Sequence, residues 1–284
     1  MPRSLVHRAV STARTIRAVV ARPPYATPGH FYSPLTAEAD RSRALSWTEA
    51  PGVDLAEERQ LALAARLRPL LAEPAPGPRC AAGNRMFGPA DAAVYRAMLA
   101  HLRPSRVIEV GSGYSTALAL DEADANPELS GLDITCIEPF PERLLEIIGE
   151  SDRKRLTLLR QPVQDVDPAA YERLGRHDVL FVDSTHVVKA GSDVVWILLH
   201  VLPRLAPGVV VHVHDVFWPF EYPAQWLRQR RDWTEIYLLH AFLATNASWE
   251  ILFFSSWFWH CRPELVPEPL AREEPGSIWL RKVR

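Results

Sequence analysis

Residues 107–116 constrain the fold of this chain more than any other segment. They read Val-Ile-Glu-Val-Gly-Ser-Gly-Tyr-Ser-Thr, an apolar run that breaks into a glycine turn and then opens a helical pattern. Glycine adopts the backbone conformations of tight turns, so backbone N–H groups there approach a ligand closely. At a helix N-terminus such groups bind anionic parts of a ligand. The segment therefore predicts a strand, a turn and a helix that together form a nucleotide-type binding site.

Short apolar runs alternate with helical patterns over the rest of the chain. This alternation predicts an α/β fold with a mostly parallel sheet and helices on both faces. Two late strands joined by a loop, after a helix expected at 235–243, predict an antiparallel edge. The expected strands are residues 107–110, 134–137, 156–159, 179–182, 209–213, 249–254 and 277–280.

The region before this alternation has a different composition. Its first 22 residues are basic, with no acidic residue before Glu38, and we expect a solvated helix there. An amphipathic helix that binds a membrane or partner, or a transit-type segment, is the alternative. A helix expected at 55–68 should end at Pro69, and a proline-rich linker follows at 74–78. We therefore expect an N-terminal extension and helical appendage over residues 1–78 and the main domain over residues 79–284.

Composition excludes several classes of protein. The net charge is −2 and 48% of the residues are hydrophobic, which indicates a globular chain without a nucleic-acid partner. No apolar run approaches the roughly 20 residues of a membrane span. The three cysteines lie far apart and form neither a metal-ligand pair nor a disulfide framework. We therefore expect a cytoplasmic protein.

The residues around the glycine turn distinguish between possible cofactors. A dinucleotide site needs a third small residue for close helix–strand packing, but Thr116 occupies that position. Glu109, two residues before the first glycine, would repel phosphate and suits a ligand that carries an amino group. These two residues favour S-adenosylmethionine over a nicotinamide dinucleotide, and they argue against a dehydrogenase.

Further polar residues follow the later strands, at the edge where open α/β sheets bind their ligands. Glu138 is placed to accept hydrogen bonds from the ribose hydroxyls. Gln164 and Asp165 are placed near the adenine amine, and Asp183 ends the fourth strand. The expected cofactor-binding residues are Glu109, Gly111, Ser112, Gly113, Tyr114, Ser115, Glu138, Gln164, Asp165 and Asp183.

With these motifs in place, residues from about 31 to 281 resemble a bacterial family of class I S-adenosylmethionine-dependent methyltransferases. The resemblance implies a Rossmann-like sheet with an antiparallel C-terminal strand, and S-adenosylmethionine as the methyl donor. It also implies that Glu109 faces the methionine end of the cofactor. The matching segments are residues 31–34, 107–116, 137–139, 162–165, 181–193, 211–223, 249–254 and 275–282.

The reaction centre is expected where the fourth and fifth strands end. Asp183, His186, His214 and Asp215 should meet there as the catalytic residues. In one interpretation His186 or His214 is a general base that the acids orient. In the other, Asp183 and Asp215 bind a divalent cation such as Mg²⁺. Catechol-type methyltransferases place metal-binding acids at these two strand ends, but their second acid is followed by Asn, whereas Val216 follows here.

We therefore expect an enzyme that transfers a methyl group to a small-molecule acceptor at a hydroxyl. The alternatives are N-methylation, a metal-dependent oxygenation on the same fold, and a non-catalytic subunit that only binds the cofactor. We also consider assembly of this chain into a homo-oligomer.

Overall fold

A computed structural model describes residues 25–72, 77–81, 83–84 and 86–284. The basic N-terminal segment and most of the proline-rich linker lie outside these residues. Among the described residues, no helix combines the length and the apolar character that crossing a membrane requires.

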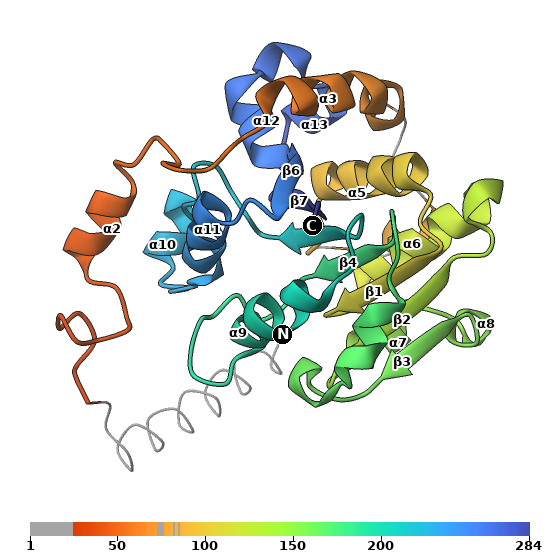
Figure 1. Cartoon of the computed structure of the whole chain (residues 1–284), viewed down its shortest axis with the longest axis horizontal. Coiled ribbons are helices and arrows are strands. Elements are labelled where there is room, and N and C mark those ends of the chain that lie inside the picture. The colour runs from red at the N-terminus through yellow and green to blue at the C-terminus, as the bar shows by residue number, and fades with distance from the viewer. Residues whose placement is uncertain (1–24, 73–76, 82, 85) are drawn as a thin grey trace. The chain divides into compact units, whose positions relative to one another are not determined.

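The core of the structure is a seven-stranded sheet in the order β3-β2-β1-β4-β5-β7-β6 (Figure 1). The first five strands are parallel, and β7 runs antiparallel between β5 and β6. The predicted α/β fold and its antiparallel C-terminal edge are confirmed, and each predicted strand lies within two residues of an observed one. The strands are β1 Arg106–Val110, β2 Asp133–Ile137, β3 Leu156–Leu159, β4 Val179–Val182, β5 Val210–His214, β6 Trp249–Phe254 and β7 Ser277–Lys282.

The central strands are apolar because both of their faces are covered. Every residue of β4 and β5 is buried, as continuous apolar runs in a parallel sheet predict. The same burial applies to His212, whose ring stacks on Phe181 with 4.1 Å between the ring centroids. His212 is therefore a histidine of the core.

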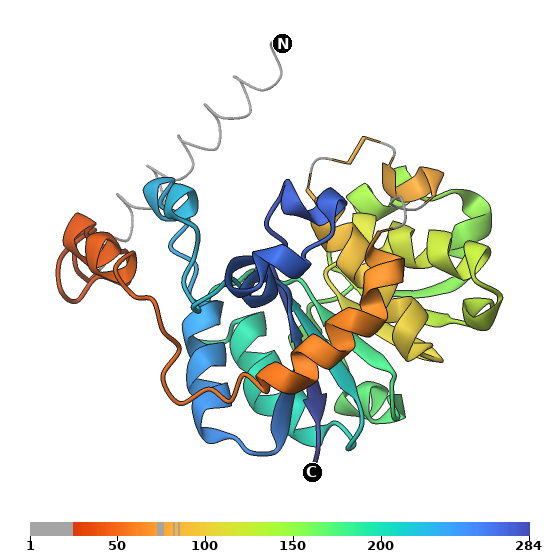
Figure 2. The same ribbon diagram turned by 90° about the horizontal axis from the view of Figure 1, so that it is seen from above.

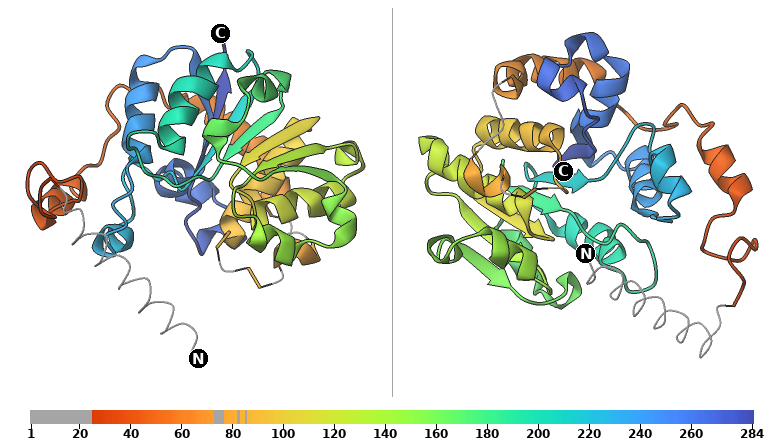
Figure 3. Two further views of the ribbon diagram at one scale, coloured as in Figure 1. Left: turned by 90° about the horizontal axis from the view of Figure 1, so that it is seen from below. Right: turned by 180° about the vertical axis from the view of Figure 1, so that it is seen from behind.

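Helices cover the sheet on both faces. The chain leaves β1 towards β2 through α6, and leaves β4 in the opposite direction towards β5 through α9. Right-handed crossovers in opposite directions place their helices on opposite faces, and Figures 2 and 3 show α9 beside α11. The α-helices are α2 Glu38–Ala44, α3 Glu57–Leu71, α4 Pro78–Ala81, α5 Pro89–Leu102, α6 Tyr114–Ala125, α7 Glu142–Ile147, α8 Glu150–Arg153, α9 Asp193–Trp196, α10 Ala224–Arg228, α11 Glu235–Thr245, α12 Ser255–Cys261 and α13 Glu268–Ala271.

Short helical turns of other kinds fill several connections. Helix α9 continues as a π-helical turn and then a 3₁₀ turn. These turns are η1 Pro127–Leu129, η2 Val163–Asp165, η3 Pro168–Arg173, η4 Ile197–Val201 (the π turn), η5 Leu202–Arg204 and η6 Pro263–Leu265.

Helix α3 continues past the proline that was expected to end it. Pro69 lies inside the last turn, and the helix ends at Leu71. The proline removes one backbone hydrogen bond, but Leu67 and Leu71 on either side of it are 0% and 1% exposed. Because α3 packs against α5 and β6, the burial of these side chains holds the last turn in place. The prediction of a stop at Pro69 is therefore wrong.

The chain divides into two compact units. The larger unit contains residues 48–223 and 233–284, and it includes the whole sheet together with α3. In the smaller unit, the described residues up to Trp47 join residues 224–232, where the backbone N–H and side chain of Thr36 bond to Asp232. The expected domain boundary near residue 78 stays a prediction.

Replacing Leu67 by Ala tests whether α3 is part of the main folding unit. The variant should lose about 2–5 kcal/mol of unfolding free energy, because a buried leucine is replaced by a cavity. Urea denaturation followed by tryptophan fluorescence measures this loss. The exposed neighbour Arg66→Ala is the control and should stay within about 0.5 kcal/mol of the wild type. An unchanged main transition in Leu67→Ala would instead support a separate appendage before residue 78.

Candidate functional site

The strand register brings residues from distant parts of the sequence to one edge of the sheet. The last paired residues of β2, β1, β4 and β5 lie level with one another. Backbone hydrogen bonds extend the ladder by one more residue, since Gly111 N donates to Ile137 O at 3.1 Å and Asp183 N donates to Val110 O at 2.9 Å. The residues that follow these strand ends form the edge: Gly111, Glu138, Asp183 and His214.

The first residue of the turn after β1 has to be glycine. Gly111 has a φ of +83°, and a Cβ built on it would overlap the carbonyl oxygen of Asp183. Neither the backbone conformation nor the space accepts a side chain. The turn is therefore packed directly against the end of β4.

Glu109 lies beneath this turn in the core. Its side chain is 1% exposed and accepts hydrogen bonds from the hydroxyls of Ser115 and Thr116. Burial raises the pKa of Glu109 to about 7, while the two hydroxyls act in the opposite direction. The structure thus gives Glu109 a part in holding the first turn of α6 to β1. The expected contact between Glu109 and a cofactor stays a prediction.

A cavity of about 410 Å³ opens beside the turn. Four of the expected cofactor residues line it, namely Gly111, Glu138, Gln164 and Asp183. The lining also contains residues that the sequence did not single out for the cofactor, from the loop between β4 and α9 and from the first residue of that helix. These are Ser184, Thr185, Lys189, Gly191, Ser192 and Asp193.

The other expected cofactor residues are absent from this lining. The side chain of Ser115 bonds to Glu109, and the Tyr114 hydroxyl donates to the carbonyl of Gly83 at 3.0 Å. The backbone N–H of Gly113 is bonded to the Thr116 hydroxyl at 3.2 Å. Asp165 is exposed at the end of η2.

Two side chains shape the rim of the cavity. The carboxylate of Glu138 accepts backbone N–H bonds from Ser112 at 3.3 Å and from Phe140 at 2.8 Å. The amide of Gln164 donates to the carbonyl of Gly191 at 2.9 Å, which ties the loop after β3 to the loop after β4. Hydrogen bonds in the cavity wall therefore join the end of β1 to the end of β2, and the loop after β3 to the loop after β4.

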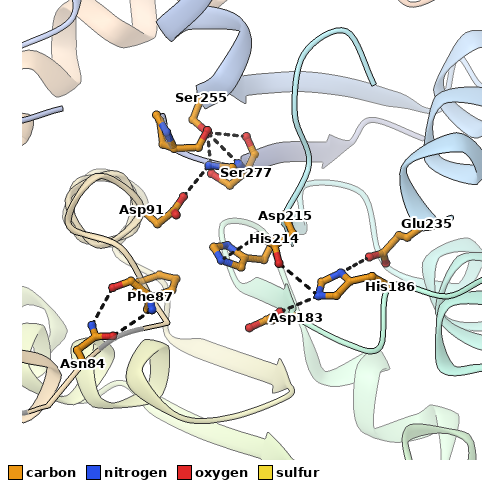
Figure 4. Close-up of polar contacts among 12 residues, drawn as sticks. Asn84, Phe87, Asp91, Asp183, His186, His214, Asp215, Glu235, Ser255 and Ser277 are labelled. Carbon is orange, nitrogen blue, oxygen red and sulfur yellow. Dashed lines mark hydrogen bonds and ion pairs between the residues drawn. The ribbon is translucent and has the colours of Figure 1, made fainter. Parts of the chain in front are cut away.

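Three side chains converge next to the cavity. Asp183 follows β4, His186 lies in the loop after β4, and Asp215 follows β5. Nε2 of His186 lies 3.2 Å from Asp183 Oδ1 and 3.5 Å from Asp215 Oδ2. Within the described chain, one ligand atom from each of these residues lies within 4.8 Å of the others, a spacing that one metal ion spans. Figure 4 shows His186 between these two acids and a third acid, Glu235.

Glu235 is a site residue that the sequence did not reveal. Its Oε2 lies 2.9 Å from Nδ1 of His186, and its side chain is 1% exposed. From the sequence it was only the first residue of an expected helix, where acidic residues are common because they favour the helix dipole. No local pattern relates it to His186, which lies 49 residues earlier.

The acids around His186 change its protonation. Burial disfavours the charged ring, but the hydrogen bonds to Asp183 and Glu235 outweigh it and raise the pKa of His186 to about 10. Burial would raise the pKa of Asp183, whereas the His186 bond and nearby charges lower it below its ordinary value. Since both ring nitrogens of His186 face carboxylates, the ring does not offer a free base at neutral pH.

His214 has a different environment. Its side chain is 5% exposed, its Nδ1 has no hydrogen-bond partner among the described residues, and its Nε2 lies 3.7 Å from Asp215 Oδ1. The ring packs against Phe87 with 5.2 Å between centroids. Asp91, at the start of α5, faces the same region (Figure 4) and accepts a bond from Gly276 N at 2.9 Å. Burial raises the pKa of Asp91 to about 6, with Asp215 acting in the same direction.

The aromatic segment after Asp215 is largely buried. Phe217, Phe220 and Tyr222 are 7%, 2% and 3% exposed, and Phe220 packs against Phe254 of β6 with 5.2 Å between ring centroids. Residues 217–223, which contain two prolines, form no helix. The segment fills the space between the end of β5 and β6, so most of it serves packing.

Replacing Glu109 by Gln tests the buried carboxyl under the turn. The folded pKa is about 7 and the unfolded value is 4.5, so the folded state keeps a proton that the unfolded state loses. This stabilisation is complete below pH 4.5 and is lost as the pH rises through 7. Between pH 5 and 8, the wild type should lose up to about 3 kcal/mol of unfolding free energy relative to Glu109→Gln.

Denaturant titrations at several pH values measure this difference. The exposed Glu146→Gln is the matched control, and its stability should follow that of the wild type at each pH. Parallel pH curves for Glu109→Gln and the wild type would contradict a protonated Glu109.

Residues 108–216 match a family described as a methyltransferase domain. An uncharacterised protein of Archaeoglobus fulgidus is 32% identical over 164 residues, which span 52% of this chain and 72% of that protein. Because this relative is archaeal, the description of the resembled family as bacterial stays a prediction.

Solved structures are similar at lower identity. A methyltransferase of Podospora anserina, bound to SAH, is 18% identical with a TM-score of 0.46, and the match covers 70% of this chain and 80% of that one. A structure of CmcI with Mg and SAM is 20% identical with a TM-score of 0.42, and the match covers 72% and 75% of the two chains.

Proposed function

Because the chain belongs to the class I S-adenosylmethionine-dependent methyltransferases, we propose that it methylates a hydroxyl group of a small-molecule acceptor with the help of a divalent cation. The convergence of Asp183, His186 and Asp215 beside the cavity carries this proposal. The cavity would hold the methyl donor, and the three side chains would hold the cation.

The residues that line the cavity suit the donor. S-adenosylmethionine supplies an electrophilic methyl group on a positively charged sulfur. A volume of about 410 Å³ is in the range of small-molecule sites. The Glu138 carboxylate has about four lone-pair sites, of which two accept backbone bonds. The others are suited to the ribose hydroxyls, and the negative charge of Asp183 favours the sulfonium.

The three converging side chains suit a divalent cation. Carboxylate oxygens are preferred by Mg²⁺ and Mn²⁺, and an imidazole nitrogen is accepted by Mn²⁺ and Fe²⁺. Two carboxylates and one histidine would hold such an ion and leave coordination positions for water or for acceptor oxygens. Asp183 and Asp215 are the ligands expected from the sequence, and Nε2 of His186 would become a third ligand when the cation displaces its proton.

This donor set favours a hydroxyl acceptor over an amine. A cation lowers the pKa of a coordinated hydroxyl and so makes its oxygen a better nucleophile. In contrast, an acid-lined site stabilises the ammonium form of an amine, which has no lone pair for attack. We assign the role of proton acceptor for the hydroxyl to His214, and the absence of a partner for its Nδ1 among the described residues supports this assignment.

The burial of the centre supports a small acceptor. The side chains of His186 and Asp215 are 6% and 19% exposed, so a folded macromolecule would reach them only through a protruding group. The acids would also repel the phosphates of a nucleic acid. A small hydroxyl compound fits both conditions.

Glu138→Gln tests the donor half of the site. The dissociation constant for S-adenosylhomocysteine should rise about tenfold, because a hydrogen bond to a charged group contributes about 1.5–3 kcal/mol. Titration calorimetry measures the affinity. The exposed Glu142→Gln, at the start of the next helix, is the control and should bind within about twofold of the wild type. Equal affinities of Glu138→Gln and the wild type would remove Glu138 from the donor site.

Removal of metal ions by EDTA tests the acceptor half of the site. With methyl-labelled S-adenosylmethionine, the enzyme should methylate members of a panel of phenols and catechols in preference to the corresponding amines. EDTA should lower the rate at least about tenfold and added Mg²⁺ or Mn²⁺ should restore it. His214→Gln should lower kcat by about 10²-fold or more without changing S-adenosylhomocysteine affinity. A rate that is insensitive to EDTA, or turnover of amines alone, would contradict the proposal.

A further inference from the structure

Glu235 contacts His186, but it is not one of the residues that would touch the donor, the acceptor or the cation. Both side chains are buried, at 1% and 6% exposure, and Oε2 lies 2.9 Å from Nδ1. The second carboxylate oxygen, Oε1, has no hydrogen-bond partner among the described residues. A charged group without full hydrogen bonding is costly in a buried position, so the pairing with His186 is the interaction that compensates for this burial.

The backbone around Glu235 holds the same histidine. The N–H groups of Thr234 and Glu235, at the start of α11, donate to the carbonyl of His186 at 2.9 and 3.1 Å. The Thr234 hydroxyl accepts a bond from Val188 N at 2.7 Å. On one side of the ring, Trp233 packs with 4.3 Å between the ring centroids. These four contacts from residues 233–235 therefore fix the position of the His186 ring and of the loop after β4.

These contacts from residues 233–235 hold His186 in an unfavourable backbone conformation. His186 has a φ of +60°, in the left-handed region that costs a non-glycine residue about 1–2 kcal/mol. The conformation persists because its surroundings determine it. The consequence for the side chain is that Nε2 lies opposite the Glu235 bond, next to Asp183 and Asp215.

We propose that Glu235 is the positioning residue of the site: it holds the proton on Nδ1 of His186 and turns Nε2 into the gap between Asp183 and Asp215. An ionised carboxylate only accepts hydrogen bonds, so Nδ1 is the donor. A carboxylate on one ring nitrogen fixes the ring and makes the other nitrogen a stronger metal ligand. The effect on a cation rests on the proposed function, whereas the orientation of the ring does not.

The chain offers a matched control that bonds to the same helix. Glu221 is a buried carboxylate, 6% exposed, that also has one oxygen without a partner among the described residues. It lies before α10 and accepts bonds from Tyr222 N at 2.8 Å and from the Tyr237 hydroxyl of α11 at 2.6 Å, so neither of these partners is His186. Glu221→Gln therefore reproduces the loss of a buried charge at α11 without changing the bond to the histidine.

The first measurement follows the ring and needs no metal. In ¹H–¹⁵N spectra of the full-length, histidine-labelled protein, the buried Nδ1–H of His186 should give an exchange-protected signal, identified by its absence in His186→Gln. Glu235→Gln should shift this signal or broaden it through exchange with water, while Glu221→Gln should leave it in place. An unchanged signal in Glu235→Gln would overturn the proposal.

The second measurement follows the cation. The dissociation constant for Mn²⁺, measured by the resonance signal of free Mn²⁺, should rise about 10- to 100-fold in Glu235→Gln and stay within about twofold in Glu221→Gln. Equal Mn²⁺ affinities for Glu235→Gln and the wild type would overturn the link between Glu235 and metal binding. If the wild type binds no Mn²⁺, the proposed cation fails, and the spectra still decide whether Glu235 positions His186.

Discussion

The hydrogen-bond ladder that joins β2, β1, β4 and β5 determines where the candidate site residues lie. These strands are parallel and in register, so their carboxyl ends reach the same edge of the sheet. A slip of one residue would turn each buried side chain to the opposite face, and every residue of β4 and β5 is buried. The packing of the core therefore also fixes the positions of Asp183 and His214. Asp183 follows the last residue of β4, and His214 is the last residue of β5.

A second constraint acts beyond the strand ends, where no ladder holds the backbone. His186 and Asp215 both adopt left-handed conformations, with φ values of 60° and 56°. Residues held in such conformations gather at functional sites, since the surrounding structure has to compensate for the strain. For His186 the compensation comes from the start of α11, far along the chain. The sheet positions the acids, and this helix positions the histidine between them.

The sequence predicted the features that have a local signature. Apolar runs located the seven strands, and polar residues after those runs located Asp183, His186 and Asp215, which do converge. Glu235 could not be found in this way, because an acid at a helix start has a sufficient local explanation. The burial of Glu109 under the turn and the continuation of α3 past Pro69 likewise depend on tertiary packing. Propensity and spacing describe a residue's neighbours along the chain, whereas these three features depend on neighbours across it.

The charges around His186 distinguish the buried contact with Glu235 from the contacts with Asp183 and Asp215. Three carboxylates surround one imidazole, and a buried charge is tolerated only when it is paired. Glu235, at 1% exposure, is paired with Nδ1, whereas Asp183, at 38%, is shared between Nε2 and the cavity. One imidazolium balances one of the three negative charges, so the excess lies on Asp183 and Asp215. In the proposed function, a positive charge bound there, on a cation or on the sulfur of the donor, would relieve their repulsion. Because Asp183 both lines the cavity and contacts His186, the occupancy of one half of the site would then affect the electrostatics of the other.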